Sequence, residues 1–206
     1  MEDLFYFIIL IFSIVIHEVS HGAMAYHLGD PTAKNAGRLT LNPISHIDIV
    51  GSVILPLFLI LSHSPFLVGW AKPVPINPYN FKDQKYGQAK SAIAGPAANI
   101  IIAVFFGLLL RFLPFSGSQS SQLFVNFFIY IVQINLLLAL FNLVPIPPLD
   151  GSHILFSFLP YSMENVKIFL NRWGMIILLV LIFLVPEFFN VLIQIVILIF
   201  KIIVGA

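Results

Sequence analysis

Two histidines and one glutamate lie within five consecutive residues, in the run His17-Glu18-Val19-Ser20-His21. Because residues four apart share one face of an α-helix, both imidazoles can reach a single metal ion. Glu18 lies about 100° further round such a helix, so its carboxylate can reach a metal-bound water rather than the metal. This is the H-E-x-x-H arrangement of zinc hydrolases, in which the glutamate is the general base.

The alternative interpretation of these residues is a pair of buried histidines satisfied by hydrogen bonds. They lie in the second half of an apolar segment, residues 4–27, that is long enough to span a membrane. Polar side chains inside a bilayer are costly and usually functional, and a metal ion offsets that cost. The pattern therefore favours a metal site.

A catalytic zinc takes three protein ligands and leaves one position open. The chain has no cysteine, so the third ligand has to be another residue type elsewhere in the sequence. Asp150 stands out because it follows three prolines in residues 141–151, where the broken helix leaves backbone groups in need of partners. Its carboxylate is a candidate ligand. The alternative is that Asp150 caps a helix that starts near Ser152.

The composition excludes several classes of protein. Hydrophobic residues make up 59% of the 206 residues and charged residues only 9%, whereas a soluble domain is typically about 25% charged. The net charge of +1 does not favour a nucleic acid partner. The absence of cysteine excludes disulfide scaffolds and iron–sulfur clusters. A polytopic membrane protein embedded in the lipid bilayer remains.

We expect an all-α polytopic membrane protein with about five transmembrane helices, forming one domain over residues 1–206. The expected parts are a metal-binding span at 4–27, a loop and re-entrant region at 28–88, core spans at 89–113 and 122–160, and a C-terminal helical hairpin at 166–204.

Two segments of the loop region carry more specific predictions. Residues 49–68 are apolar but contain Pro56 and Pro65, and we expect them to enter and leave the membrane on one side; a plain span is the alternative. Residues 37–42 alternate in polarity and would suit a short membrane-associated β-element.

Basic residues indicate the orientation in the cell membrane. All but Arg111 lie in loops or helix ends that one side of the membrane can share: Lys34, Arg38, Lys72, Lys82, Lys85, Lys90, Lys167, Arg172 and Lys201. If that side is the cytoplasm, the N-terminus is outside. With 49–68 re-entrant, His17, His21 and Asp150 then all lie toward the cytoplasmic ends of their helices.

Three motifs follow one another along the chain: His17-Glu18-x-x-His21, Ala94-Gly95-Pro96-Ala97-Ala98-Asn99 and Asn142-x-x-Pro145 with Leu149-Asp150-Gly151. In this order they resemble the site-2 protease family of intramembrane zinc metalloproteases, and especially its short bacterial and archaeal members without PDZ or CBS domains.

The resemblance implies a function and a role for each matched residue. His17, His21 and Asp150 would bind one zinc ion per chain, and Glu18 would activate a zinc-bound water. Asn142 would lie near the scissile bond, where an amide can donate to the developing oxyanion. The reaction would be cleavage of transmembrane segments of membrane-protein substrates, as in regulated intramembrane proteolysis. The run from Gly95 to Asn99 would serve helix packing.

Two further histidines could lie around the metal ligands. His153 follows Asp150 by three residues, and His46 has polar neighbours in the loop region. A membrane zinc transporter or sensor that uses the same ligands is the alternative function. It would need a second polar row along the path of the metal, which the sequence does not contain.

Overall fold

The computed structural model describes residues 2–54, 57–58, 61–62, 71–113 and 119–205. Its long helices are α1 (Glu2–His27), α4 (Gly87–Phe112), α5 (Gln119–Asn142), α7 (Glu164–Leu184) and α8 (Pro186–Val204). The shorter elements are α2 (Thr32–Asn35), α6 (Asp150–Phe158), a π-helical segment η2 (Ile49–Ile54) and the 3₁₀ turns η1 (Pro43–His46), η3 (Pro78–Asn80) and η4 (Tyr161–Met163).

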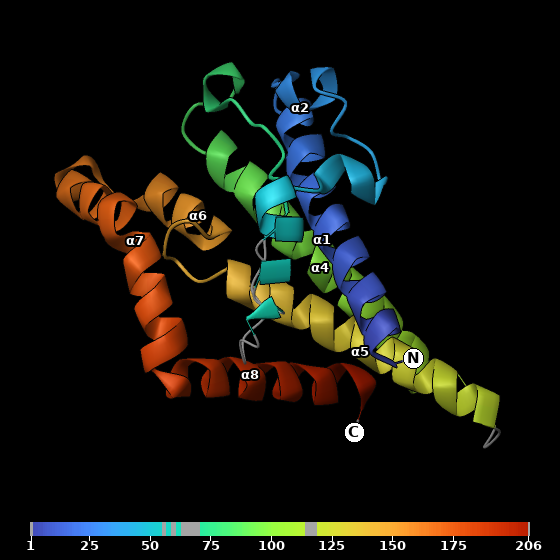
Figure 1. Ribbon diagram of the computed structural model, residues 1–206. Coiled ribbons are helices and arrows are strands. Elements are labelled where there is room, and N and C mark those ends of the chain that lie inside the picture. The colour runs from blue at the N-terminus through green and yellow to red at the C-terminus, as the bar shows by residue number, and fades with distance from the viewer. Residues whose placement is uncertain (1, 55–56, 59–60, 63–70, 114–118, 206) are drawn as a thin grey trace.

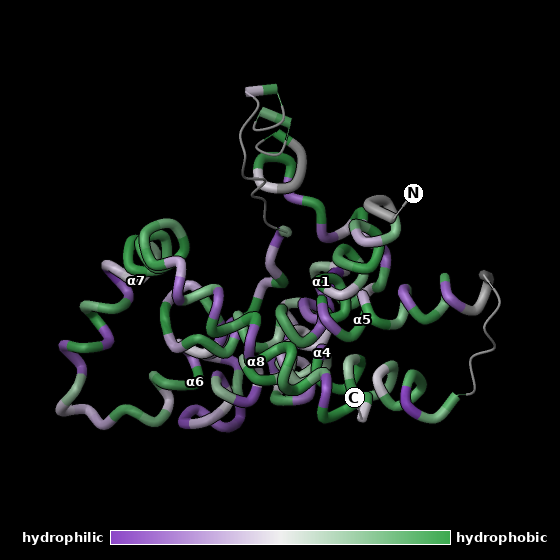
Figure 2. Tube along the Cα trace, turned by 90° about the horizontal axis from the view of Figure 1, so that it is seen from below, coloured by the Kyte–Doolittle hydropathy of each residue, from purple (hydrophilic) through white to green (hydrophobic). Residues whose placement is uncertain are grey.

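The predicted fold class is confirmed. The five long helices include segments that are long and apolar enough to cross a membrane. Hydrophobic residues run along α1, α7 and α8 in Figure 2, as a lipid-facing surface requires. Figure 1 shows α1, α4 and α5 packed together, with α6 and α7 to one side and α8 running across the lower end.

Small residues allow close approach where α4 meets its neighbours. Ala103 is fully buried on α4, and it packs against Val132 and Leu136 of α5 and Val196 of α8. Further along α4, a side chain at Gly107 would collide with Ile203 of α8. Such contacts are typical of helix packing in membranes, where van der Waals fit replaces the hydrophobic effect.

Helices α1 and α4 are antiparallel. His21 near the end of α1 bonds to Ser91 near the start of α4, and Ser13, earlier on α1, bonds to Asn99, later on α4. Residues 28–86 therefore begin and end on the same side of this helix pair. A single crossing by residues 49–68 would instead have made α4 parallel to α1.

The segment 49–68 itself lies partly outside the described residues. Within it, η2 begins after Asp48, whose carboxylate accepts a hydrogen bond of 2.7 Å from the backbone N–H of Gly51. That the segment is re-entrant stays a prediction, and the antiparallel arrangement of α1 and α4 supports it.

The β-element predicted for residues 37–42 is not formed. A strand has to pair its backbone with a neighbouring strand, and local side chains take that place here. The carbonyl of Thr40 bonds to His46 Nε2 at 2.9 Å. The side chain of Asn42 accepts from the N–H of Ile44 and caps η1. The alternating polarity of 37–42 therefore does not correspond to a strand.

A proline-rich segment, residues 71–77, crosses the second half of α1, and we call it the strap. The N–H of Lys72 donates to the carbonyl of His46, and Arg38 donates to the carbonyl of Lys72. At the other end, the N–H of Asn77 donates to the carboxylate of Asp30 at 2.7 Å. Side chains of Arg38 and Asp30 and the backbone carbonyl of His46 therefore hold the strap without a β-ladder.

Asp30 is a fully buried carboxylate that joins the loop after α1 to the strap and η3. Burial alone would raise its pKa. Hydrogen bonds from Thr32, Asn77 and Asn80 outweigh burial and lower the pKa of Asp30 below its ordinary value. The charged form is therefore the one that the fold stabilises.

The C-terminal segment forms the two helices α7 and α8, with Pro186 in the first turn of α8. They do not pack side by side as a hairpin would, because α8 runs across the lower end of the bundle (Figure 1), where it packs against α4 and α5. One detail differs from the charge pattern. The end of α8, which carries Lys201, packs against the end of α4, where Arg111 donates to the carbonyl of Ile202 at 3.4 Å. The basic residues of these two helix ends, which the charge pattern assigned to opposite sides, are therefore neighbours. The positions of charges along the chain do not predict this contact between α4 and α8, because it depends on how the two helices pack.

Candidate metal centre

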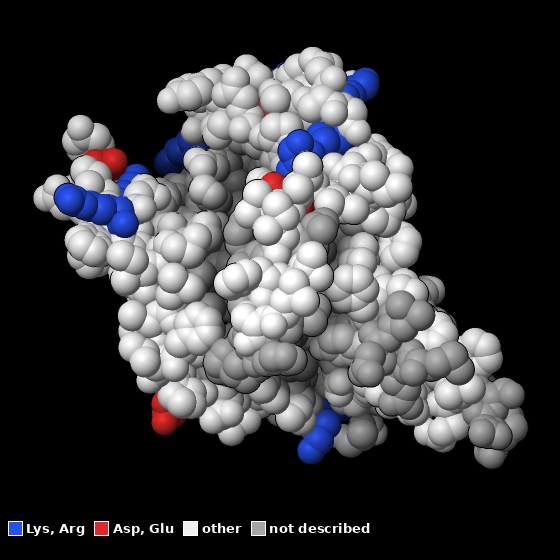
Figure 3. All heavy atoms as spheres, in the orientation of Figure 1, with Lys and Arg blue, Asp and Glu red and all other residues white. Residues whose placement is uncertain are grey.

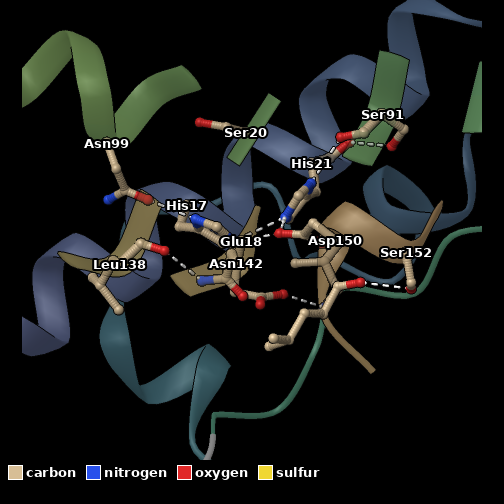
Figure 4. Close-up of polar contacts among 12 residues, drawn as sticks. His17, Glu18, Ser20, His21, Ser91, Asn99, Leu138, Asn142, Asp150 and Ser152 are labelled. Carbon is tan, nitrogen blue, oxygen red and sulfur yellow. Dashed lines mark hydrogen bonds and ion pairs between the residues drawn. The ribbon is translucent and has the colours of Figure 1, made fainter. Parts of the chain in front are cut away.

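Side chains from α1 and α6 converge on one point (Figure 4). His17 Nε2 lies 3.0 Å from Asp150 Oδ2, and His21 Nε2 lies 3.2 Å from the same oxygen. The two Nε2 atoms are 3.0 Å apart. Both histidines are buried, and among the described residues these three form the one group of His, Asp and Glu side chains arranged to hold a metal ion.

The outer ring nitrogens of the two histidines determine where their protons lie. His21 Nδ1 is 2.8 Å from the backbone carbonyl of Ser91, which can only accept, so Nδ1 carries the proton. His17 Nδ1 is 2.6 Å from Asn99 Oδ1, also an acceptor. When the two rings are neutral, both Nε2 atoms are therefore free of protons and can present lone pairs to a metal ion next to Asp150.

These donors fit a zinc ion. Two imidazole lone pairs and a carboxylate repel one another at this distance unless a proton or a metal cation lies between them, and the neutral rings leave that place to a metal. Ligand atoms about 2.0–2.1 Å from a tetrahedral zinc are roughly 3.3 Å apart, close to the separations observed here. An outer nitrogen that donates to a carbonyl is the usual support of a metal-binding histidine.

The break between α5 and α6 positions Asp150. The helix cap is Leu149, and Asp150 is the first residue of α6, so the alternative of Asp150 as the cap is wrong. Ser152 Oγ donates to the carbonyl of Leu149 at 2.7 Å. Gly151 lies so close to the carbonyls of Leu143 and Val144 that no Cβ fits there. The tight turn aims the carboxylate of Asp150 at α1.

A stripe on α4 completes the surroundings of the histidines. Ser91, Gly95 and Asn99 are spaced four apart and share one face of α4. The outer two bond to His21 and His17, and Gly95 lies between them against both imidazoles. The sequence motif predicts helix packing for Gly95 and Asn99 but does not indicate their contact with the ligands. A signal for this contact is present in the sequence, because small or polar residues occur at every fourth position of an apolar span.

Replacing Gly95 with alanine is expected to weaken zinc binding by at least about 10-fold. A Cβ at Gly95 would lie 2.7 Å from His17 Nε2 and closer still to His21 Nε2, so both rings would have to move. Competition with a chelator measures the affinity. Gly107→Ala is the matched control. Gly107 lies on the same helix as Gly95 but far from the ligands, and a side chain there would crowd Ile203 of α8. An unchanged affinity in Gly95→Ala would contradict the prediction.

Glu18 lies next to the ligands in sequence but outside their group. Its side chain is half-buried, and Oε2 accepts a hydrogen bond of 2.8 Å from the backbone N–H of Val74 in the strap. A side chain at Gly22, one turn further along α1, would collide with Val74. The strap therefore packs directly on the helix of the H-E-x-x-H motif and orients its glutamate.

The remaining predicted site residues make other contacts. Asn142 Nδ2 donates to the carbonyl of Leu138, one turn back on α5. His153 Nδ1 bonds to Gln88, and the ring of His46 bonds to Thr40 while its carbonyl holds the strap. None of these contacts reaches a metal ligand. The roles expected of Asn142, His46 and His153 stay predictions.

Comparisons with known proteins find a peptidase family and several zinc metalloproteases similar to this chain. A model of "Peptidase family M50" matches residues 115–181. The chain is 39% identical over 178 residues to "Putative zinc metalloprotease YwhC" of Bacillus subtilis, which covers 84% of this chain and 78% of that protein. It is 27% identical over 169 residues to "Putative zinc metalloprotease Rip2" of Mycolicibacterium smegmatis, covering 82% of this chain and 62% of that protein. No solved structure matches the chain significantly.

The similarity to YwhC extends over most of both proteins. The family model includes the break between α5 and α6 and Asp150. The resemblance indicated by the three sequence motifs is confirmed, and with it a zinc metalloprotease that hydrolyses peptide bonds. The chain belongs to peptidase family M50, the site-2 protease family of zinc metalloproteases.

Proposed function

We propose that this chain is an intramembrane endopeptidase that cleaves transmembrane segments of other membrane proteins. The observation that carries the proposal is the convergence of three lone-pair donors, from His17, His21 and Asp150, on one point within an apolar helix bundle. We take residues 1–206 as a single membrane-embedded domain.

In this proposal His17, His21 and Asp150 hold one zinc ion per chain. Bound zinc supplies Lewis-acid chemistry, polarising a carbonyl and making water more acidic. Glu18 takes the proton of the attacking water on its carboxylate and passes it to the nitrogen of the leaving amine. The bond from the N–H of Val74 supports this role, because it restricts the orientation of the carboxylate.

Asn142 is our candidate donor to the oxyanion. It is the last residue of α5 and lies eight residues before Asp150. Because its amide donates to the carbonyl of Leu138, it would have to leave that bond in order to reach a substrate. An amide that donates only when charge develops on the substrate oxygen favours the transition state over the ground state.

The depth of the ligands supports a transmembrane substrate. His17 and His21 lie within the candidate span Phe5–His27. A transmembrane helix hides its carbonyls in hydrogen bonds, so the substrate has to unwind locally before attack. Helix-breaking residues near the cleaved bond should therefore speed cleavage.

The distribution of charge supports an orientation. In Figure 3 Lys and Arg side chains gather around the end of the molecule where α1 ends and α2 lies. By the positive-inside rule we propose that this end faces the cytoplasm, that the N-terminus is outside, and that the site opens toward the cytoplasmic side of the cell membrane.

Removing the metal is expected to abolish cleavage, and about one zinc ion per chain should restore it. The assay uses detergent-purified protein and a labelled peptide that carries a transmembrane segment. A version of the peptide with two central leucines replaced by glycine should be cleaved faster. Magnesium serves as control, because it prefers oxygen ligands and should not restore activity. Cleavage that persists without zinc, or a chain that binds none, would contradict the proposal.

A further inference from the structure

We propose that Asn99 and Asn135 are positioning residues that hold His17 in the tautomer needed to bind zinc. This inference rests on the proposed zinc site. It concerns a buried chain of hydrogen bonds on the far side of the His17 ring, which runs from α1 through α4 to α5.

The direction of each bond in this chain is determined by a backbone carbonyl at its end. Asn135 Nδ2 donates to the carbonyl of Ile131 at 2.9 Å, so Asn135 Oδ1 has to be the acceptor of the next bond. Asn99 Nδ2 donates to that oxygen at 2.7 Å. Asn99 Oδ1 therefore faces His17 Nδ1, which has to carry the proton.

Ser13 fixes the same direction a second time. Its carbonyl accepts from Asn99 Nδ2 at 3.3 Å, and its hydroxyl oxygen accepts from Asn135 Nδ2 at 2.9 Å. Both hydrogens of each amide are thereby used. Turning the amide of Asn99 round would place its oxygen against two other acceptors, the carbonyl of Ser13 and Asn135 Oδ1.

Burial makes such a reversal costly. Asn99 is 0% exposed, Asn135 1% and Ser13 4%. A buried polar group that loses its hydrogen-bond partner destabilises the fold, and no water replaces the partner inside an apolar bundle. The amide of Asn99 therefore stays an acceptor toward His17, and the neutral His17 ring keeps its proton on Nδ1 and its lone pair on Nε2, on the side of Asp150.

The two histidines are supported in different ways. His21 donates to the backbone carbonyl of Ser91, which no side-chain substitution removes. His17 depends on a side chain, Asn99, and on the partner that orients it, Asn135. A single side-chain substitution can therefore change the tautomer of His17, but not that of His21.

The test has two parts. Nitrogen-15 NMR of the metal-free wild-type protein, with labelled histidine, should show a proton on Nδ1 of His17, the nitrogen that faces Asn99. Chelator competition should show zinc binding 10–100-fold weaker in Asn99→Leu, and weakened in the same direction in Asn135→Leu, as expected for the partner of a metal-binding histidine. In Asn99→Leu the NMR spectrum should show a mixture of His17 tautomers.

Two further variants separate positioning from packing. Val132→Ala removes fully buried volume from α5 next to Leu136 and should lower the melting temperature without changing zinc affinity. Asn99→Asp keeps an acceptor for His17 Nδ1 but cannot donate to Ser13 and Asn135. It should therefore keep zinc affinity within about threefold while losing stability.

Three results would overturn the inference. They are a wild-type His17 protonated at Nε2 but not at Nδ1, a zinc affinity unchanged in Asn99→Leu, and an affinity that merely follows the melting temperature across all variants. If an asparagine variant does not fold, the wild-type spectrum still decides. A wild-type protein that binds no zinc would contradict the proposed function instead, since the tautomer is measured without metal.

Discussion

Replacing Glu18 with glutamine should lower kcat for cleavage by about 10²- to 10⁴-fold while zinc remains bound. Glutamine has nearly the size of glutamate and can still accept a hydrogen bond from the N–H of Val74, but it cannot take a proton from water. Because Glu18 lies outside the ligand group, the zinc content should stay at the wild-type value. Single-turnover cleavage of the transmembrane peptide, with zinc measured on the same sample, tests both statements.

Glu164→Gln is the matched control for this substitution. Glu164 starts α7, is about half exposed and pairs only loosely with Lys167, at 3.5 Å. Its loss should leave cleavage and zinc content unchanged. Cleavage by Glu18→Gln at the wild-type rate would mean that another residue is the base. If neither wild type nor variant cleaves peptides but both carry zinc across vesicle membranes, the transporter alternative is correct.

Replacing Asp150 with asparagine should weaken zinc binding by more than about 100-fold, beyond the effect expected for residues that only support a ligand. The carboxylate is the one anionic group among the three ligands, and its charge balances part of the charge of the metal. An amide of the same size is a poorer ligand, and its N–H groups can bond to His17 Nε2 in place of the metal. The measurement is zinc per chain under chelator competition.

Asp83→Asn is the control for the loss of a carboxylate. Asp83 lies outside the metal centre, in the loop before α4, where it pairs with Lys90 at 2.6 Å. Its substitution should leave zinc affinity unchanged. If Asp150→Asn bound zinc as tightly as the wild-type protein, the third ligand would have to be another residue, and the turn between α5 and α6 would have a purely structural role.

Much of the site could be predicted because its signals are local. The spacing of His17 and His21 needs only the periodicity of one helix, and the helical spans need only their length and apolar composition. Asp150 is marked by the prolines before it, which break α5 whatever surrounds them. The three motifs in order are similarly a property of the chain alone, and they were enough to indicate the family.

Contacts between distant segments decided the rest. The stripe of Ser91, Gly95 and Asn99 faces the histidines only because α4 packs antiparallel to α1, which lies 70 to 82 residues away in sequence. The strand expected at 37–42 is absent because its backbone groups found side-chain partners instead of a neighbouring strand. A helix repeats every 3.6 residues and can be read along the chain, whereas the partner of each buried polar group depends on which helices meet. The tautomer of His17 depends on such a partner, Asn99 of α4, and therefore on the tertiary structure.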